Sequence, residues 1–147
     1  MSNEKIKLLL VDDEPLIRES LYEILRMEGY IVQTAETGEK ALEVMQTSAI
    51  DIVVTDFKLP KMSGLDLLKE IKKRYPKTEI ILITGYGSIE SAVEAMKVGA
   101  FDYVTKPIND NEIKIIIGKI VENKKIIEEN ENLKDILSRE RPSSYCA

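Results

Sequence analysis

The 147-residue chain, with 44% hydrophobic and 32% charged residues, has the composition of a soluble globular protein, and its net charge of −5 argues against binding a nucleic-acid backbone. The absence of histidine excludes histidine-based catalysis and histidine-ligated metals, and the single cysteine, Cys146, cannot form an internal disulfide. Neither a bilayer-spanning apolar run nor a signal peptide is present, so we expect a cytoplasmic protein without membrane contact.

Five short apolar runs, rich in β-branched and bulky residues, alternate with segments of helical periodicity. The predicted strands are residues 6–11, 30–34, 51–55, 79–84 and 102–105. Three of them are almost continuously hydrophobic, which is typical of strands that are covered on both faces. The sequence therefore predicts an α/β fold with a five-stranded parallel sheet, helices on both faces and right-handed crossovers.

The helical segments between these strands carry apolar stripes and terminal signals. The predicted buried stripes are Ile17, Leu21, Ile24 and Leu25 in one helix and Ile89, Ala92, Val93 and Met96 in another. Pro15 suits a first helical turn, and Ser63 and Asn109 are candidate N-cap residues. Gly29 and Gly99 fall where helices are expected to end.

The last helical pattern is longer than the sheet requires. It starts at Asn109 and continues to about Ser138, and thirty helical residues span roughly 45 Å. We therefore expect a domain over residues 1–121, an extended helical linker over 122–138 and a disordered tail over 139–147. Apolar positions in the linker fit a short heptad pattern, which leaves both a coiled coil and a solvated linker open.

Residues that can carry chemistry gather at the carboxyl ends of the predicted strands. Asp12 and Asp13 follow the first strand, and Asp56 follows the third. Thr84 closes the fourth strand and Lys106 follows the fifth. Each residue alone has an ordinary explanation as a cap, strand or loop residue. In an open α/β sheet, however, ligands bind at this edge, and three acids, a hydroxyl and an amine rarely meet there by chance.

Crowded carboxylates need a compensating charge. Two unit charges ~4 Å apart repel by about 4 kcal/mol at an effective dielectric constant of 20, while a whole domain is stable by only ~5–15 kcal/mol. Mg²⁺, which prefers oxygen ligands, resolves the conflict. Asp56 can then act as a nucleophile that forms an aspartyl phosphate. Mg²⁺ and Lys106 would neutralise the phosphoryl oxygens, and the Thr84 hydroxyl would hydrogen-bond to the phosphate.

From residue 5 to about residue 121, the chain resembles the receiver domain of bacterial two-component response regulators. The resemblance is carried by four stretches: VDDEP, VVTDFKLPKMSGLDLL, IILITGYG and GAFDYVTKP. The resemblance implies the strand order 2-1-3-4-5. It implies that Asp56 accepts a phosphoryl group from the phosphohistidine of a sensor kinase. It further implies that Asp13, Asp56 and the backbone carbonyl of Lys58 hold Mg²⁺, with Asp12 contributing through water.

The same resemblance implies a switch. The Thr84 hydroxyl would move toward the phosphate, and the Tyr103 ring would turn inward. The surface of the fourth helix, fifth strand and fifth helix would change shape and serve as a homodimer or effector surface, with the linker helix as the other candidate dimer contact. The chain looks most like receivers of the nitrogen-regulatory (NtrC) type in two stretches, TGYGSIESAVEAMKVGA and GAFDYVTKP. Receivers of that type precede ATPase and DNA-binding output domains.

We therefore expect a phosphorylation-activated switch that controls transcription and catalyses only its own phosphorylation and dephosphorylation. The amino-terminal part of a longer activator is favoured over a stand-alone receiver. A phosphatase of the haloacid dehalogenase type would need a general acid where this chain has Lys58. A dinucleotide-binding domain would need glycines where it has acids, and a coiled-coil adaptor leaves the acids unexplained.

Overall fold

The computed structural model describes residues 6–85 and 89–124. One parallel sheet has the strand order β2-β1-β3-β4-β5, as expected. The strands are β1 (Lys7–Val11), β2 (Ile31–Ala35), β3 (Ile52–Asp56), β4 (Glu79–Thr84) and β5 (Asp102–Thr105). The helices are α1 (Pro15–Met27), α2 (Gly38–Thr47), α3 (Gly64–Arg74), α4 (Ile89–Val98) and a helix over residues 110–124. The predicted strand bounds differ from these by at most one residue.

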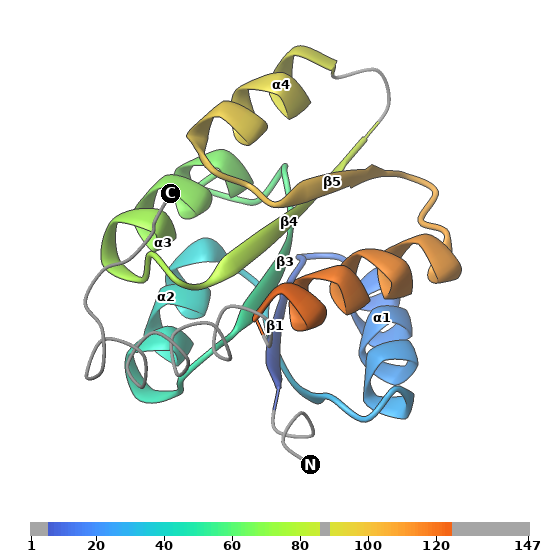
Figure 1. Cartoon of the computed structure of the whole chain (residues 1–147). Coiled ribbons are helices and arrows are strands. Elements are labelled where there is room, and N and C mark those ends of the chain that lie inside the picture. Colours follow the sequence, from blue (N-terminus) through green and yellow to red (C-terminus); the bar gives the residue numbers. More distant parts are fainter. Residues whose placement is uncertain (1–5, 86–88, 125–147) are drawn as a thin grey trace, which may run out of the picture.

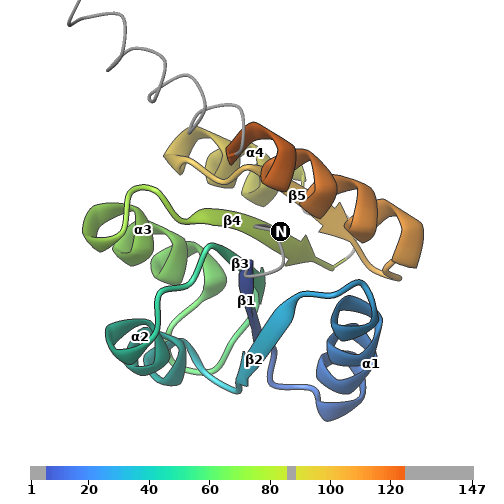
Figure 2. The same ribbon diagram turned by 60° about the horizontal axis from the view of Figure 1, so that its bottom comes forward.

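Helices cover both faces of the sheet (Figures 1 and 2). One hydrophobic cluster joins α1 and the helix over 110–124 to one face, and a second joins α2, α3 and α4 to the other. Because side chains alternate along a strand, Leu9 and Val53 enter one cluster while Leu10 and Val54 enter the other. The central strands are therefore buried on both sides, which explains their continuous apolar character.

Local signals set the helix ends as the sequence predicts. The side-chain oxygens of Ser63 and Asn109 each accept a hydrogen bond of 3.1 Å from the backbone N–H three residues later. Pro15 is the first residue of α1. Gly29 and Gly99 have φ values of +99° and +130°, a region that side chains with a Cβ rarely adopt.

The apolar stripe predicted for α4 is partly wrong. Ala92 and Ala95 are buried, whereas Val93 and Met96 are 48% and 41% exposed. Small side chains let a helix lie close to the layer beneath it, so α4 packs through Ala92 and Ala95 and turns Val93 and Met96 outward. The side chain of Ile89, the remaining residue of the predicted stripe, lies outside the described part of the chain. The stripe predicted for α1 is confirmed, because Leu21 and Leu25 are buried in one cluster and the partly buried Ile17 and Ile24 pack against it.

The described residues include only the start of the predicted linker. The last helix begins at residue 110 and continues to residue 124, the end of the described part. The remainder of the linker, with its heptad pattern, and the tail over 139–147 lie outside the described residues, so the division of the chain stays a prediction. Across residues 6–85 and 89–124, no helix combines the length and apolar character that crossing a membrane requires.

Gly64, the first residue of α3, lies against the backbone that follows β3. Its N–H donates to the Phe57 carbonyl at 2.8 Å. An added Cβ would overlap the carbonyl oxygen of Asp56 and lie 2.8 Å from the Phe57 Cα. We expect Gly64→Ala to lower the free energy of unfolding by roughly 1–3 kcal/mol, measured by urea denaturation, because backbone atoms cannot yield without moving the loop.

Gly118 offers a matched control for this prediction. It is exposed on the helix over 110–124, and an added Cβ would meet nothing within 4 Å. Gly118→Ala should leave stability unchanged or raise it by about 0.5–1 kcal/mol. Equal stability of the Gly64 and Gly118 variants would contradict the steric account.

Candidate functional site

Three carboxylates meet where β1 and β3 end. Asp12 and Asp13 follow β1, Asp56 ends β3, and one oxygen of each lies within 4.8 Å of the others. The strands pair in parallel with Val11 opposite Thr55, and this register brings the acids together. Asp12 and Asp56 are only 2% and 4% exposed, whereas Asp13 is exposed. The predicted convergence of the three acids is therefore confirmed, and the cluster reaches solvent through Asp13.

The buried Asp12 carboxylate has only one of its two oxygens satisfied. Oδ1 accepts a hydrogen bond of 2.9 Å from the Glu14 N–H, whereas Oδ2 is buried without a partner among the described residues. Burial raises the pKa of Asp12 from 3.8 to about 6, and the charge of Asp56 acts in the same direction against the Glu14 hydrogen bond. A cation would satisfy such an oxygen and relieve the repulsion.

Lys106 approaches the acidic cluster from the end of β5. Its Nζ lies 3.1 Å from Asp56 Oδ2 and 3.4 Å from Glu14 Oε1. Burial disfavours the charged amine, but the hydrogen bond and charge of Asp56, together with Asp12 and Glu14, outweigh it and raise the pKa of Lys106. The Lys106–Pro107 peptide bond is cis. Lys106 therefore lies beside Asp56, at the edge of the sheet where the sequence places both residues.

The remaining predicted residues, Thr84, Tyr103 and Lys58, lie on three different segments of the chain. Thr84 is buried at the end of β4, and its hydroxyl donates to the Val104 carbonyl at 3.5 Å. Tyr103, on β5, is 37% exposed. The Lys58 N–H donates to Asp56 Oδ1 at 3.3 Å, and the Lys58 side chain is exposed. The Thr84 hydroxyl thus turns toward β5, and the contact of Lys58 with Asp56 runs through its N–H.

Two residues near the site were not singled out from the sequence. Glu14 pairs with Lys106, and Arg18 Nη1 donates to the Asp12 carbonyl at 2.7 Å. Glu14 and Arg18 stand four residues apart, a spacing that places two side chains on one face of a helix. That spacing, directly after two aspartates, is the sequence feature from which contacts of Glu14 and Arg18 with the site could have been predicted.

Comparison with known proteins agrees with this fold. The family model described as "Response regulator receiver domain" matches residues 8–118. A putative NtrX-like response regulator of Rickettsia bellii is 40% identical over 131 residues, which cover 88% of this chain and 27% of that protein. The response regulator protein PilR of Pseudomonas aeruginosa is 39% identical over 112 residues, covering 76% and 25%. The chain thus spans about a quarter of the length of these curated relatives.

Solved structures show the same architecture. A response regulator receiver domain protein from Clostridium thermocellum is 38% identical, with a TM-score of 0.79 over 83% of this chain and 98% of that one. NtrX from Brucella abortus, in complex with ADP, is 34% identical, with a TM-score of 0.82 over 88% of this chain and 30% of that one. With the family match over residues 8–118, these likenesses establish that the chain belongs to the response regulator receiver domain family and resembles the receivers of NtrC-type regulators.

Proposed function

We propose that this receiver domain works as a phosphorylation switch in which Asp56 accepts a phosphoryl group from a sensor histidine kinase. The observation that carries the proposal is the meeting of three carboxylates and one lysine at a single edge of the sheet. A receiver is a signalling switch rather than a turnover enzyme. Asp56 would undergo one covalent event, and hydrolysis of the acyl phosphate would reset it.

The residues of the cluster fit a divalent cation. They offer hard oxygen ligands, and Asp12 contributes a buried oxygen without a partner among the described residues. We assign Mg²⁺ to Asp12, Asp13 and Asp56, with the backbone carbonyl of Lys58 as a further ligand. When bound, Mg²⁺ neutralises charge on the carboxylates and on the phosphoryl oxygens.

The protein's own groups prepare Asp56 for transfer. The Lys58 N–H on Oδ1 and the Lys106 ammonium on Oδ2 orient the carboxylate. One carboxylate oxygen attacks phosphorus, a new O–P bond forms, and the P–N bond to the donor imidazole breaks. Because its pKa is raised, Lys106 stays protonated and places positive charge beside the oxygens that gain negative charge.

The switch would begin at Thr84. Its hydroxyl donates to the carbonyl of Val104, directly after Tyr103 in β5. Turning the hydroxyl toward a phosphate on Asp56 would release that carbonyl and open space for the Tyr103 ring. Tyr103 lies at the surface, and nearby α4 exposes Val93 and Met96. A change in this apolar surface, formed by α4, β5 and the helix over 110–124, would control a homodimer or effector contact.

We place this domain ahead of ATPase and DNA-binding output domains in a longer activator. Its curated relatives are about four times longer than the matched part, and the similar NtrX chain was solved with ADP. The helix over residues 110–124 would continue as a linker over 122–138, which is the second candidate dimer contact. A stand-alone receiver that acts through protein contacts is the alternative arrangement.

The phosphoacceptor assignment predicts a single covalent event. With acetyl phosphate and Mg²⁺, intact mass spectrometry should show one added phosphoryl group on the wild type and none on Asp56→Asn. Asp66→Asn, which alters an exposed acid of α3, should remain phosphorylated and serves as the control. Phosphorylation of Asp56→Asn at the wild-type level would refute the assignment. Sedimentation of the same samples would report any change in dimerisation.

The raised pKa of Asp12 predicts an unusual pH dependence of metal-free stability. The folded state binds this proton more tightly than the unfolded chain, so the stabilisation is complete below about pH 3.8 and is lost as the pH rises through about 6. Relative to Asp12→Asn, the metal-free wild type should lose about 2 kcal/mol of unfolding free energy between about pH 4.5 and pH 7.5.

Urea denaturation in a chelator checks this prediction. At each pH, the unfolding free energy of Asp12→Asn is subtracted from that of the wild type. This subtraction cancels the contributions of titrating groups that the two proteins share. Saturating Mg²⁺ at the higher pH should restore stability more in the wild type than in the variant, because the cation offsets the charge of Asp12. Parallel pH profiles without metal would argue against a buried, crowded carboxylate.

A further inference from the structure

The backbone and side chain of Asp12 are held from three directions. Its N–H donates to the Ala35 carbonyl of β2 at 3.2 Å. Its Oδ1 accepts from the Glu14 N–H at 2.9 Å, and its carbonyl accepts from Arg18 Nη1 at 2.7 Å. Oδ2 alone lacks a partner among the described residues. Three fixed contacts on a buried residue leave a single oxygen for a ligand.

Among these three contacts, only that of Arg18 uses the side chain of another residue. It stands in the second turn of α1, where its backbone N–H donates to the Glu14 carbonyl at 3.0 Å. The buried Leu21 and Leu25 fix α1 against the sheet. The guanidinium therefore reaches from a rigid helix back to the loop that carries Asp12, and its charge strengthens the hydrogen bond.

The contact of Arg18 is with a carbonyl rather than with a carboxylate. Among the ion pairs between described residues, none involves Arg18, and the cation that pairs with the acidic cluster is Lys106. Arg18 therefore acts on the position of the loop, whereas Lys106 compensates charge.

We propose that Arg18 is a positioning residue for the cation site, because its hydrogen bond to the Asp12 carbonyl holds Asp12 Oδ2 within the acidic cluster. This inference rests on the proposed Mg²⁺ site. It assigns to α1 a role in setting cation affinity, in addition to its role in covering the sheet.

Removing the guanidinium would leave a buried carbonyl without its donor and would loosen the loop between β1 and α1. Outer contacts that orient metal ligands typically contribute 10–100-fold in affinity, so Arg18→Met should raise the Mg²⁺ dissociation constant roughly 10-fold. The rate of phosphorylation by acetyl phosphate at saturating Mg²⁺ should stay near that of the wild type, because Asp56 and Lys106 keep their contacts. Arg18→Lys, which retains a charged donor, should recover part of the affinity.

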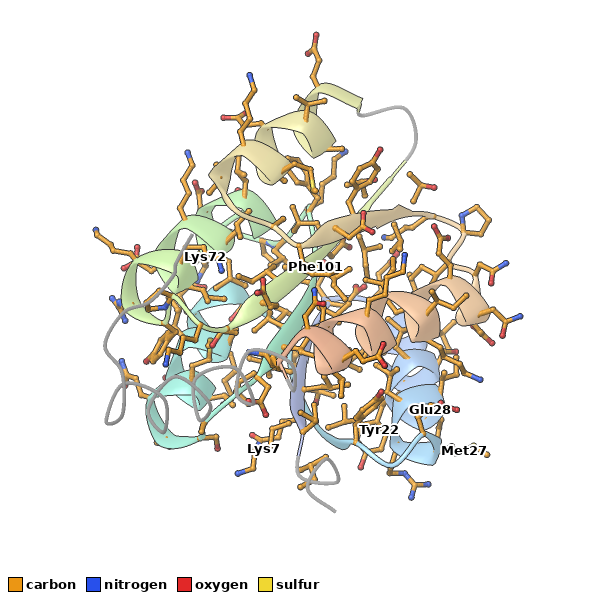
Figure 3. All side chains as sticks on the ribbon, in the orientation of Figure 1. Lys7, Tyr22, Met27, Glu28, Lys72 and Phe101 are labelled. Atoms are coloured by element: carbon orange, nitrogen blue, oxygen red, sulfur yellow. The ribbon has the colours of Figure 1, made fainter. Side chains whose placement is uncertain are left out.

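Arg26 provides the matched control on the same helix. It pairs with Glu23 at 3.2 Å and lies 5.9 Å from the centre of the Tyr22 ring. Tyr22 and Met27 mark this end of α1 in Figure 3, near the edge of the sheet where Lys7 begins β1. Arg26→Met removes the same charge far from the carboxylates and should leave Mg²⁺ affinity unchanged.

The test combines Mg²⁺ titration calorimetry with phosphorylation rates measured across Mg²⁺ concentrations, for the wild type and each variant. A rise in the dissociation constant confined to Arg18→Met, with partial recovery in Arg18→Lys, supports the proposal. The proposal is overturned if the Mg²⁺ dissociation constant of Arg18→Met is unchanged, or if Arg26→Met loses as much Mg²⁺ affinity. It is also overturned if Arg18→Met lowers the phosphorylation rate at saturating Mg²⁺ without changing the Mg²⁺ concentration that gives half of that rate. Should Arg18→Met fail to fold, Arg18→Gln, whose shorter side chain cannot reach the carbonyl, is judged by the same criterion.

The wild-type titration separates this inference from the proposed function. Mg²⁺ binding by the wild type that is abolished in Asp13→Asn but unaffected in Arg18→Met overturns only the role of Arg18. If the wild type binds no Mg²⁺, the metal site and the role of Arg18 fail together. Phosphorylation of Asp56 is measured independently of Mg²⁺ binding, by intact mass spectrometry.

Discussion

Repulsion among Asp12, Asp13 and Asp56 is the interaction on which the rest of the site depends. The parallel pairing of β1 and β3 forces their side chains together, and burial of Asp12 and Asp56 removes much of the water that would screen them. Lys106 compensates one negative charge and is shared with Glu14. The fold therefore carries an unfavourable arrangement that a divalent cation relieves, at the place where the proposed phosphoacceptor lies.

The layered fold is stable enough to tolerate the crowded carboxylates, and it connects them to the surface of α4 and β5. Hydrophobic clusters on both faces of the sheet supply stability away from the carboxyl edge, so that edge can hold polar groups that do not stabilise the fold. From the acids, a short route leads through Thr84 and the Val104 carbonyl to Tyr103 on the outer strand. The proposed signal would thus cross only two neighbouring strands before it reaches the exposed apolar residues of α4.

Much of the fold and site could be predicted from the sequence, for identifiable reasons. Strands buried on both faces are continuous apolar runs, and the acids that follow them must share one edge of a parallel sheet. The strand order came from the resemblance rather than from periodicity. The face of α4 was only partly predicted: Ala92 was expected to be buried and is, but the larger Val93 and Met96 were chosen over Ala95, whose small side chain carries little hydrophobic signal. Contacts such as that of Arg18 with a carbonyl six residues earlier depend on loop geometry that no periodicity encodes.

Locating the cation in the folded protein is the most direct test of the proposed site. Mn²⁺ accepts the same oxygen ligands as Mg²⁺ and broadens the NMR signals of nuclei close to it. Addition of Mn²⁺ should broaden the amide signals of Asp12, Asp13 and Asp56 first, while those of Lys7 and Glu28, at the opposite edge in Figure 3, stay sharp. Broadening centred elsewhere, or spread evenly over exposed acids, would contradict a single cation site formed by the crowded carboxylates.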